Sequence, residues 1–384
     1  MRGFGRTLGS ALVMLGLVAA VGLAAGPGPM PAAASVQPSG LAEQALTGSS
    51  QTSPVRSASR ATARGSVPQL TQLHFGSPLA ISDAGVFFGR ARGFFQAQGI
   101  DVDILPFQSG SDIIAPMASG DLQVAGGGLS LAVLNALDRG IRIQAVADKG
   151  SARQGFQFTQ FPVRRDLLDS GAVRSVADLR GRHIGVSALR ASSEAIVSHV
   201  LSQAGLSIDD VDLVPMGYPD MVVALGNQAL DAAILIEPSL GAAYARGVIG
   251  QWDPGMISAA FGGNYQAALL FFNEQLASQP DLARRFLYAY LQGVRVYNDA
   301  FVKGQGRAEA IQVLIDSTQI KDPAAYEQMQ LAGLDPDGQI YRPSLEVELA
   351  YHRARGYYTG AATLDSLLDP SFAQAAAQQL GPYQ

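Results

Sequence analysis

The sequence of 384 residues contains no cysteine. No disulfide can form, so the folded chain must be stabilised by burial of its apolar side chains. The absence of thiols also excludes thiol catalysis, cysteine-ligated metal sites and attachment of a lipid through cysteine.

Histidine is almost as scarce, with four residues at positions 74, 183, 199 and 352. They are far apart in the sequence and form no metal-binding pattern, and we expect His183 to be a packed or edge residue of a strand. The sequence also lacks a phosphate-binding loop and the His-Glu-x-x-His and Gly-x-Ser-x-Gly motifs. We therefore expect no catalytic residues, no bound metal and no cofactor.

Positive charge is in deficit, because 27 Lys and Arg residues face 32 Asp and Glu residues, for a formal net charge of −5. An acidic chain of this kind is a poor partner for nucleic acid. A small ligand is not restricted in the same way, since net charge does not report the sign of the charge inside a pocket.

The N-terminal segment has the pattern of a secretory signal. Arg2 and Arg6 precede an apolar stretch at residues 8–25, and prolines and small residues follow. We predict a signal peptide at residues 1–34 and therefore a periplasmic or extracytoplasmic location. The alternative is an uncleaved membrane anchor, and membrane contact is expected only through one of these two. Residues 35–68, which are polar and without a period, are predicted to be a disordered tether.

From Leu70 onward, short apolar strands alternate with helical segments, which favours an α/β fold with mostly parallel sheets flanked by helices. One series has strands at 70–76, 102–107, 124–126 and 143–147, with a helix at about 82–98, and a second has strands at 183–186, 211–215 and 232–236. Strands at 156–163 and 265–272 are predicted to cross between two lobes as a hinge, after which the chain is helical to its end. The lobes are predicted to comprise residues 69–158 with 263–384, and residues 159–262.

Two passages carry a family resemblance: GFFQAQGIDVDI at residues 93–104 and SVADLRGRHIGV at residues 175–186. Together they resemble the NMT1/THI5-like branch of transporter-associated binding proteins, across residues 70 to 380. The resemblance implies a type II periplasmic binding protein fold with a two-strand hinge. It also implies a solute receptor that binds a small molecule and delivers it to the permease of an ABC importer, and we expect a monomer.

In open parallel sheets, ligands bind beyond the carboxyl ends of the strands, where helices begin. In the first series these turns contain Ser82, Asp83, Ser109, Gly128 and Ser130, which we predict to contact the ligand. The alternative for the serines and the aspartate is a purely structural role as helix caps. The glycines at 126–128 would let backbone N–H groups approach a ligand.

In the second series, Arg190, Ser192 and Ser193 combine a cation, two hydroxyls and a helix start, which is typical of an anion site. The alternative for Arg190 is a solvated position in the loop. Tyr218 would stack on the ligand or cover the edge of the core. Glu237 ends the run LDAAILIEP, which resembles the family's cleft-bordering Asp-Ala…Glu-Pro element. It would bind the ligand, pair with Arg190, or serve only the helix dipole.

Arg190, the serines and the helix starts favour an organic anion, such as a sulfonate or a carboxylate, whereas Glu237 and Tyr218 leave room for an amine or an aromatic ring. The resemblance itself covers importers of sulfonates, nitrate, pyrimidines and flavins. The same branch includes a pyrimidine synthase that uses a cysteine-rich segment, and a chain without cysteine lacks that chemistry. A binding module that serves a sensor or a docking partner is the alternative to an importer receptor.

Overall fold

The computed structural model describes residues 70–327 and 329–384, all within one compact unit. The predicted signal peptide (1–34) and tether (35–68) lie outside the described residues. No helix in the described part of the chain is long and apolar enough to cross a membrane.

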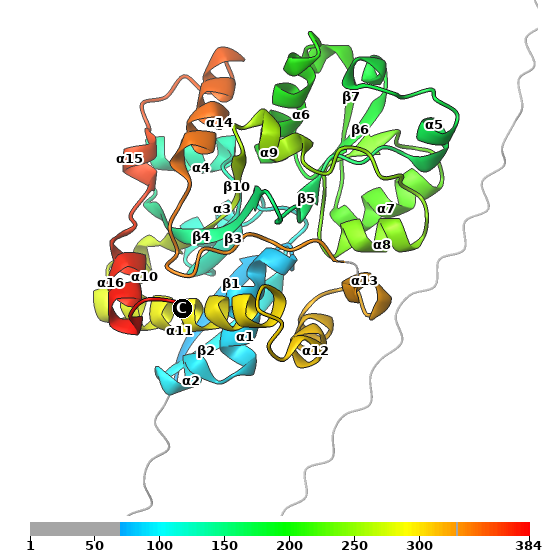
Figure 1. The fold of residues 1–384 in the computed structure, drawn as a ribbon. Helices are drawn as coiled ribbons and strands as arrows, with labels where there is room; N and C mark the ends of the chain where they lie inside the picture. The colour runs from blue at the N-terminus through cyan, green and yellow to red at the C-terminus, as the bar shows by residue number, and fades with distance from the viewer. Residues whose placement is uncertain (1–69, 328) are drawn as a thin grey trace, which may run out of the picture. The chain divides into compact units, whose positions relative to one another are not determined.

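The larger of the sheets has five strands in the order β2-β1-β3-β10-β4 (Figure 1). Strands β1 and β2 are parallel, as are β1 and β3, whereas β10 is antiparallel to both of its neighbours. One reversed strand therefore lies inside an otherwise parallel sheet. The strands are β1 (Thr71–Ser77), β2 (Ile100–Pro106), β3 (Val124–Gly127), β4 (Ile143–Arg153) and β10 (Asn264–Asn273).

Helices α1 (Ala84–Ala91) and α11 (Pro280–Phe301) lie side by side against this sheet (Figure 1). Their axes come close because glycines meet at the crossing, where a Cβ on Gly293 would lie 2.0 Å from the Gly85 carbonyl oxygen. The predicted helix at 82–98 is divided instead into the 3-10 turn η1 (Ile81–Asp83), α1 and α2 (Phe94–Ala97), because Gly93 adopts a left-handed φ of 72°.

A second sheet of three parallel strands has the order β7-β6-β8. Strand β6 occupies His183–Val186, as predicted, and β7 (Asp212–Pro215) and β8 (Ala232–Ala233) flank it. The strand predicted at 232–236 is divided into β8 and β9 (Leu235–Ile236), and β9 pairs with β5 (Thr159–Gln160) in a separate antiparallel ribbon. The strand predicted at 156–163 is therefore reduced to two residues.

Strand β4 continues to Arg153, whereas the strand at 143–147 was predicted to end at residue 147. It pairs with β10 along most of its length, with register shifts beginning after Gln266. An irregular segment, residues 329–341, runs alongside this pair: Ser151 bridges Gly333, and the Asp148 N–H donates to the Gly338 carbonyl at 2.9 Å. The C-terminal part is thus not helical throughout. The lobe boundaries given above remain a prediction.

The remaining helices cover the two sheets and fill the connections between strands. They are α3 (Ile114–Ser119), α4 (Leu131–Asp138), α5 (Arg165–Asp169), η2 (Val176–Leu179), α6 (Ser192–Gln203), η3 (Ile208–Asp210), α7 (Tyr218–Gly226), α8 (Ser239–Ala245), α9 (Met256–Ala260), α10 (Glu274–Ala277), α12 (Arg307–Ser317), α13 (Ala324–Glu327), α14 (Arg342–Ala354), α15 (Leu364–Leu367) and α16 (Ser371–Leu380).

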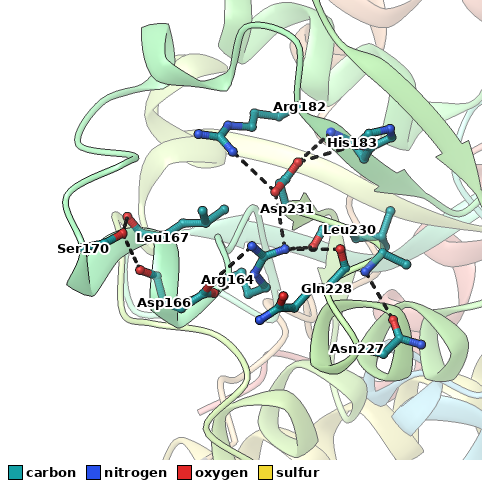
Figure 2. A network of polar contacts seen from close by, with 11 residues as sticks. Arg164, Asp166, Leu167, Ser170, Arg182, His183, Asn227, Gln228, Leu230 and Asp231 are labelled. Atoms are coloured by element: carbon teal, nitrogen blue, oxygen red, sulfur yellow. Dashed lines mark hydrogen bonds and ion pairs between the residues drawn. The ribbon is translucent and has the colours of Figure 1, made fainter.

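A polar network fastens the amino end of the second sheet (Figure 2). Arg164 pairs with Asp166 at 2.6 Å and donates to the Leu230 carbonyl at 3.0 Å, just before β8. Asp231 accepts from the backbone N–H of His183, and the His183 ring is half exposed beside it. His183 is therefore the first residue of the middle strand of this sheet rather than a packed or edge residue, because its ring is exposed and only its backbone N–H donates a hydrogen bond to Asp231.

Candidate ligand-binding site

A cavity lies where the carboxyl ends of strands from the two sheets face each other. It leaves about 70 Å³ for the centre of a water-sized sphere, enough for a few waters or a small organic molecule. The first sheet contributes the turns after β1 and β3 and the middle of β4. The second contributes the turn before α6 and the start of α7. The polar and aromatic lining residues are Ser82, Ser111, Lys149, Phe158, Thr159, Ser187, Ser192, Ser193, Tyr218 and Tyr265.

Lys149 is the one charged side chain among the described residues that line this cavity. Its Nζ lies 2.6 Å from Asp83 Oδ1 and donates to Ser82 Oγ at 3.0 Å, and both charged side chains are almost completely buried. Asp83 also accepts from the Ser77 hydroxyl and the Ala80 N–H. An ammonium has three protons and only two are used by these partners, so one remains for a ligand.

Gly126 provides the space for this lysine. A Cβ on that residue would lie 2.2 Å from Lys149 Cε, so no larger residue fits on β3 at that position. Gly126, the first glycine of the predicted triplet, therefore leaves room for the buried side chain of Lys149, which comes from β4. Gly127, in turn, lies directly against Gly110, because a Cβ on it would be 2.9 Å from the Gly110 Cα.

The start of α6 meets the turn after β3 at the cavity edge. The N–H of Leu131 donates to the Arg190 carbonyl at 3.0 Å, and Ser192 Oγ lies 2.8 Å from the Leu129 carbonyl oxygen. Gly128 makes this approach possible, since a Cβ there would lie 2.2 Å from Ser192 Oγ. The turn after β3 and the start of α6 thus contact each other at the edge of the cavity, and we call this contact the closed arrangement.

Two tyrosines line the cavity. Burial raises the pKa of Tyr218, which begins α7 and whose hydroxyl faces Ser187. Tyr265, on β10, is completely buried, and its hydroxyl lies beside Ser192 and Glu348 without forming a well-aligned hydrogen bond to a described residue. A buried hydroxyl without a partner is unfavourable by about 1–3 kcal/mol, so this oxygen is a natural contact for a polar ligand atom or a water.

The structure brings five of the predicted site residues to the cavity wall, and these are Ser82, Gly128, Ser192, Ser193 and Tyr218. The other five lie outside the lining. Of these, Asp83 is the partner of Lys149, Ser109 donates to Asp112 Oδ2 at 3.0 Å, and Ser130 caps α4 by accepting from the Val133 N–H. Each of these three side chains therefore makes a structural contact, which was the alternative to ligand binding.

Arg190 and Glu237 also lie outside the lining. The Arg190 guanidinium is placed over the Tyr357 ring, 5.1 Å from its centroid. Glu237 is completely buried and accepts from the backbone N–H groups of Gly241 and Gln330, both at 2.9 Å. Burial raises its pKa to about 8. The structure shows no ion pair between Arg190 and Glu237, so the pairing considered from the sequence is not found.

Sequence reasoning missed Lys149 and Tyr265. A signal existed for Lys149, which lies two residues beyond the predicted end of a strand and directly before Gly150. Tyr265 was recognised only as part of a buried aromatic strand. No group of three His, Cys, Asp or Glu side chains within 70–327 and 329–384 could hold a metal ion.

Comparison with known proteins places this site in context. A family model described as NMT1/THI5-like matches residues 81–299, more than half of the chain. A protein of Brucella abortus, described only as a binding protein, is 25% identical over 206 residues, which cover 51% of this chain and 57% of that protein. The chain thus aligns with little more than half of that relative's length.

Two solved structures show the same fold. The ligand-binding component of an ABC-type import system from Staphylococcus aureus, with zinc bound, matches with a TM-score of 0.65 at 12% identity, covering 80% of this chain and 99% of that one. The alkanesulfonate-binding protein SsuA of Xanthomonas axonopodis pv. citri, bound to MOPS, matches with a TM-score of 0.59 at 17% identity, covering 80% and 98%. The fold is therefore that of a type II periplasmic binding protein, and the chain belongs to the NMT1/THI5-like family.

Proposed function

We propose that this protein is an extracytoplasmic solute receptor that captures a small organic anion in the cavity and delivers it to an ABC importer. The observation that carries the proposal is the charge of the cavity wall: Lys149 lines it and no carboxylate of the described residues does. The family membership and the solved neighbours support a binding protein of an importer. A sulfonate or a carboxylate is the ligand class that this wall favours.

The anion would bind between Lys149 and the start of α6. Asp83 offsets much of the lysine charge, so the remaining attraction comes from the free ammonium proton, the positive end of the α6 dipole and nearby hydroxyls. Ser82 and Ser187 are placed on opposite sides of the cavity and supply such hydroxyls. Of the residues predicted from the sequence, we assign ligand contact to Ser82, Gly128, Ser192, Ser193 and Tyr218, and we add Lys149 and Tyr265.

Size narrows the ligand class further. In the closed arrangement the cavity holds only a few water-sized spheres, so a flavin would not fit without a large opening. A compact acid with a short carbon chain matches the space and the apolar part of the wall. Binding would stabilise the closed state because the ligand contacts both edges only there.

The proposed location follows from the predicted signal peptide at residues 1–34. We infer a monomer that acts without catalysis, whose membrane partner is the permease.

A thermal-unfolding screen tests the proposal. The purified chain is refolded from denaturant to remove any bound ligand and is then heated with sulfonates, carboxylates, amines, pyrimidines or flavins. A ligand at 100 times its dissociation constant adds about 2.7 kcal/mol of stability, which raises the midpoint by several degrees.

The proposal requires a shift with at least one short-chain sulfonate or carboxylate, confirmed by calorimetric titration. A shift with amines alone would refute the anion assignment and keep the receptor. No shift with any class, in a chain shown to be folded, would refute the receptor itself and favour a sensor or docking module.

A further inference from the structure

The hydroxyl of Ser192 has two acceptors and a single proton to give. Its Oγ lies 2.8 Å from the Leu129 carbonyl oxygen and 2.8 Å from Glu348 Oε2. A carbonyl oxygen can only accept, and an ionised carboxylate can only accept. Both contacts are therefore hydrogen bonds only if Glu348 is protonated, so that Glu348 donates to Ser192 and Ser192 donates to Leu129.

The surroundings of Glu348 favour this protonated form. Its side chain, on α14, is completely buried, and within the described ranges it forms no ion pair. Its second oxygen, Oε1, has no hydrogen-bond partner there. Burial raises the pKa of Glu348 to about 8, against a smaller opposing effect of the Ser192 and Tyr265 hydroxyls.

The other titratable groups near this carboxyl come from α6, β10 and α14 itself. From α6, Glu194 accepts from the Tyr351 hydroxyl at 2.6 Å, and His199 lines a surface groove that also reaches Glu348. On α14, His352 is completely buried with neither ring nitrogen bonded, and burial lowers its pKa. Tyr265 faces Glu348 from β10. None of these groups supplies a cation paired with the carboxyl, although the positive end of α6 favours its ionised form to a lesser degree.

We infer that Glu348 is a positioning residue whose proton holds Ser192 against Leu129, and that this contact keeps the ligand-facing edges of the two sheets together. The same edge carries the hydrogen bond from Leu131 to Arg190 and the bridge between Ser130 and Ala191. Loss of the proton leaves two acceptors competing for one hydroxyl and places an unpaired carboxylate in the interior. The edges then separate, and the closed arrangement is lost as the pH rises.

Because the chain has no cysteine, spin labels can be attached at two introduced cysteines alone, and the fraction of molecules in the closed arrangement can be measured. Arg139→Cys and Gln203→Cys place spin labels on exposed positions at the far ends of α4 and α6, the two helices that begin at the contact. Distances between the labels are recorded by pulsed electron paramagnetic resonance on the purified chain without ligand, from pH 6 to 9.5. We expect the short-distance population to fall at least fivefold across this range, with a midpoint near pH 8.

Two substitutions test whether ionisation of Glu348 causes the change of distance with pH. Glu348→Gln keeps a donor for Ser192 and cannot ionise, so the short distance should persist at every pH. Glu237→Gln is the matched control, because it removes another buried carboxyl with a pKa near 8 and should leave the transition in place. Circular dichroism at each pH establishes that the labelled variants are folded.

The inference is overturned by a short-distance population that does not change with pH, or by the same transition in Glu348→Gln. If Glu348→Gln does not fold, Ser192→Ala gives a second test. This variant removes the shared hydroxyl and should show a low, pH-independent closed population, whereas an unchanged transition would overturn the inference. The measurement uses no ligand, so its failure leaves the proposed receptor function standing.

Discussion

Replacement of Lys149 by methionine should destabilise the protein strongly, although methionine has a similar length and fits the same space. The lysine and Asp83 are 2% and 0% exposed, with 2.6 Å between their charged atoms. Removing one partner of a buried ion pair is typically unfavourable by about 3–5 kcal/mol, because the other charge stays in the interior. Asp83 keeps two hydrogen bonds, from Ser77 and Ala80, so we expect the lower end, about 3 kcal/mol.

The double variant Lys149→Met with Asp83→Asn separates the two contributions. It leaves no buried charge, and asparagine can still accept from Ser77 and Ala80. Replacing a whole buried pair by neutral groups is often close to neutral. We therefore expect the double variant to recover to within about 1 kcal/mol of the parent, while its affinity for the anion identified in the screen stays at least tenfold reduced.

Urea unfolding, followed by circular dichroism, measures both variants. A single variant that loses less than about 1 kcal/mol would refute the reasoning, because it would mean that water reaches Asp83 and compensates its charge. A double variant as unstable as the single one would also contradict it. Full anion affinity in a stable double variant would remove Lys149 from the binding site.

Four further outcomes follow from the same geometry. Gly128→Ala should weaken anion affinity at least tenfold in titration calorimetry, because the added Cβ would lie 2.2 Å from Ser192 Oγ at the cavity edge. Unchanged affinity would contradict this. Stability should fall as pH rises from about 4.5 to 8, because the native Glu237 carboxyl keeps a proton that the unfolded chain has lost, and this residue contributes up to about 1.4 kcal/mol per pH unit. Glu348 contributes a slope of the same sign. Glu237→Gln should therefore reduce the slope in urea titrations without abolishing it, and an unaltered slope would exclude this residue as a source. Tyr265→Phe should leave the ligand-free protein as stable as the parent, or up to about 1 kcal/mol more stable, and should lower its affinity for the anion. Arg190→Ala should change that affinity less than threefold. A large loss of affinity in the arginine variant would restore the anion-binding role predicted from the sequence.

The parts of the fold that depend on local pattern could be predicted. The strand at His183–Val186 and the long strand at 264–273 follow from runs of apolar residues with clear breaks on either side. The break in the first helix was missed, because the spacing of apolar residues does not show whether Gly93 continues a helix or adopts the left-handed conformation of a turn. Strand β4 was ended too early because Asp148 and Lys149 have the composition of a loop.

The site could be predicted at the level of turns but not of side chains. Ser192 and Tyr218 reach the cavity because the helix starts at strand ends all face it. Lys149 is comprehensible as a buried residue only beside Asp83, which is 66 positions away. Glu348 lies on a helix with charged neighbours on its exposed side, and its burial depends on contacts with α6 and β10. Polar groups that pair across a long stretch of chain cannot be predicted from the local order of residues.

The reversed strand β10 has a consequence for how the chain reaches its native state. It lies between β3 and β4, yet it is synthesised more than a hundred residues after both. Until residue 273 is available, the first sheet is missing an inner strand and β3 and β4 have no common neighbour. Closing so long a loop slows folding. Completion of the first sheet is therefore a late event in the synthesis of this chain.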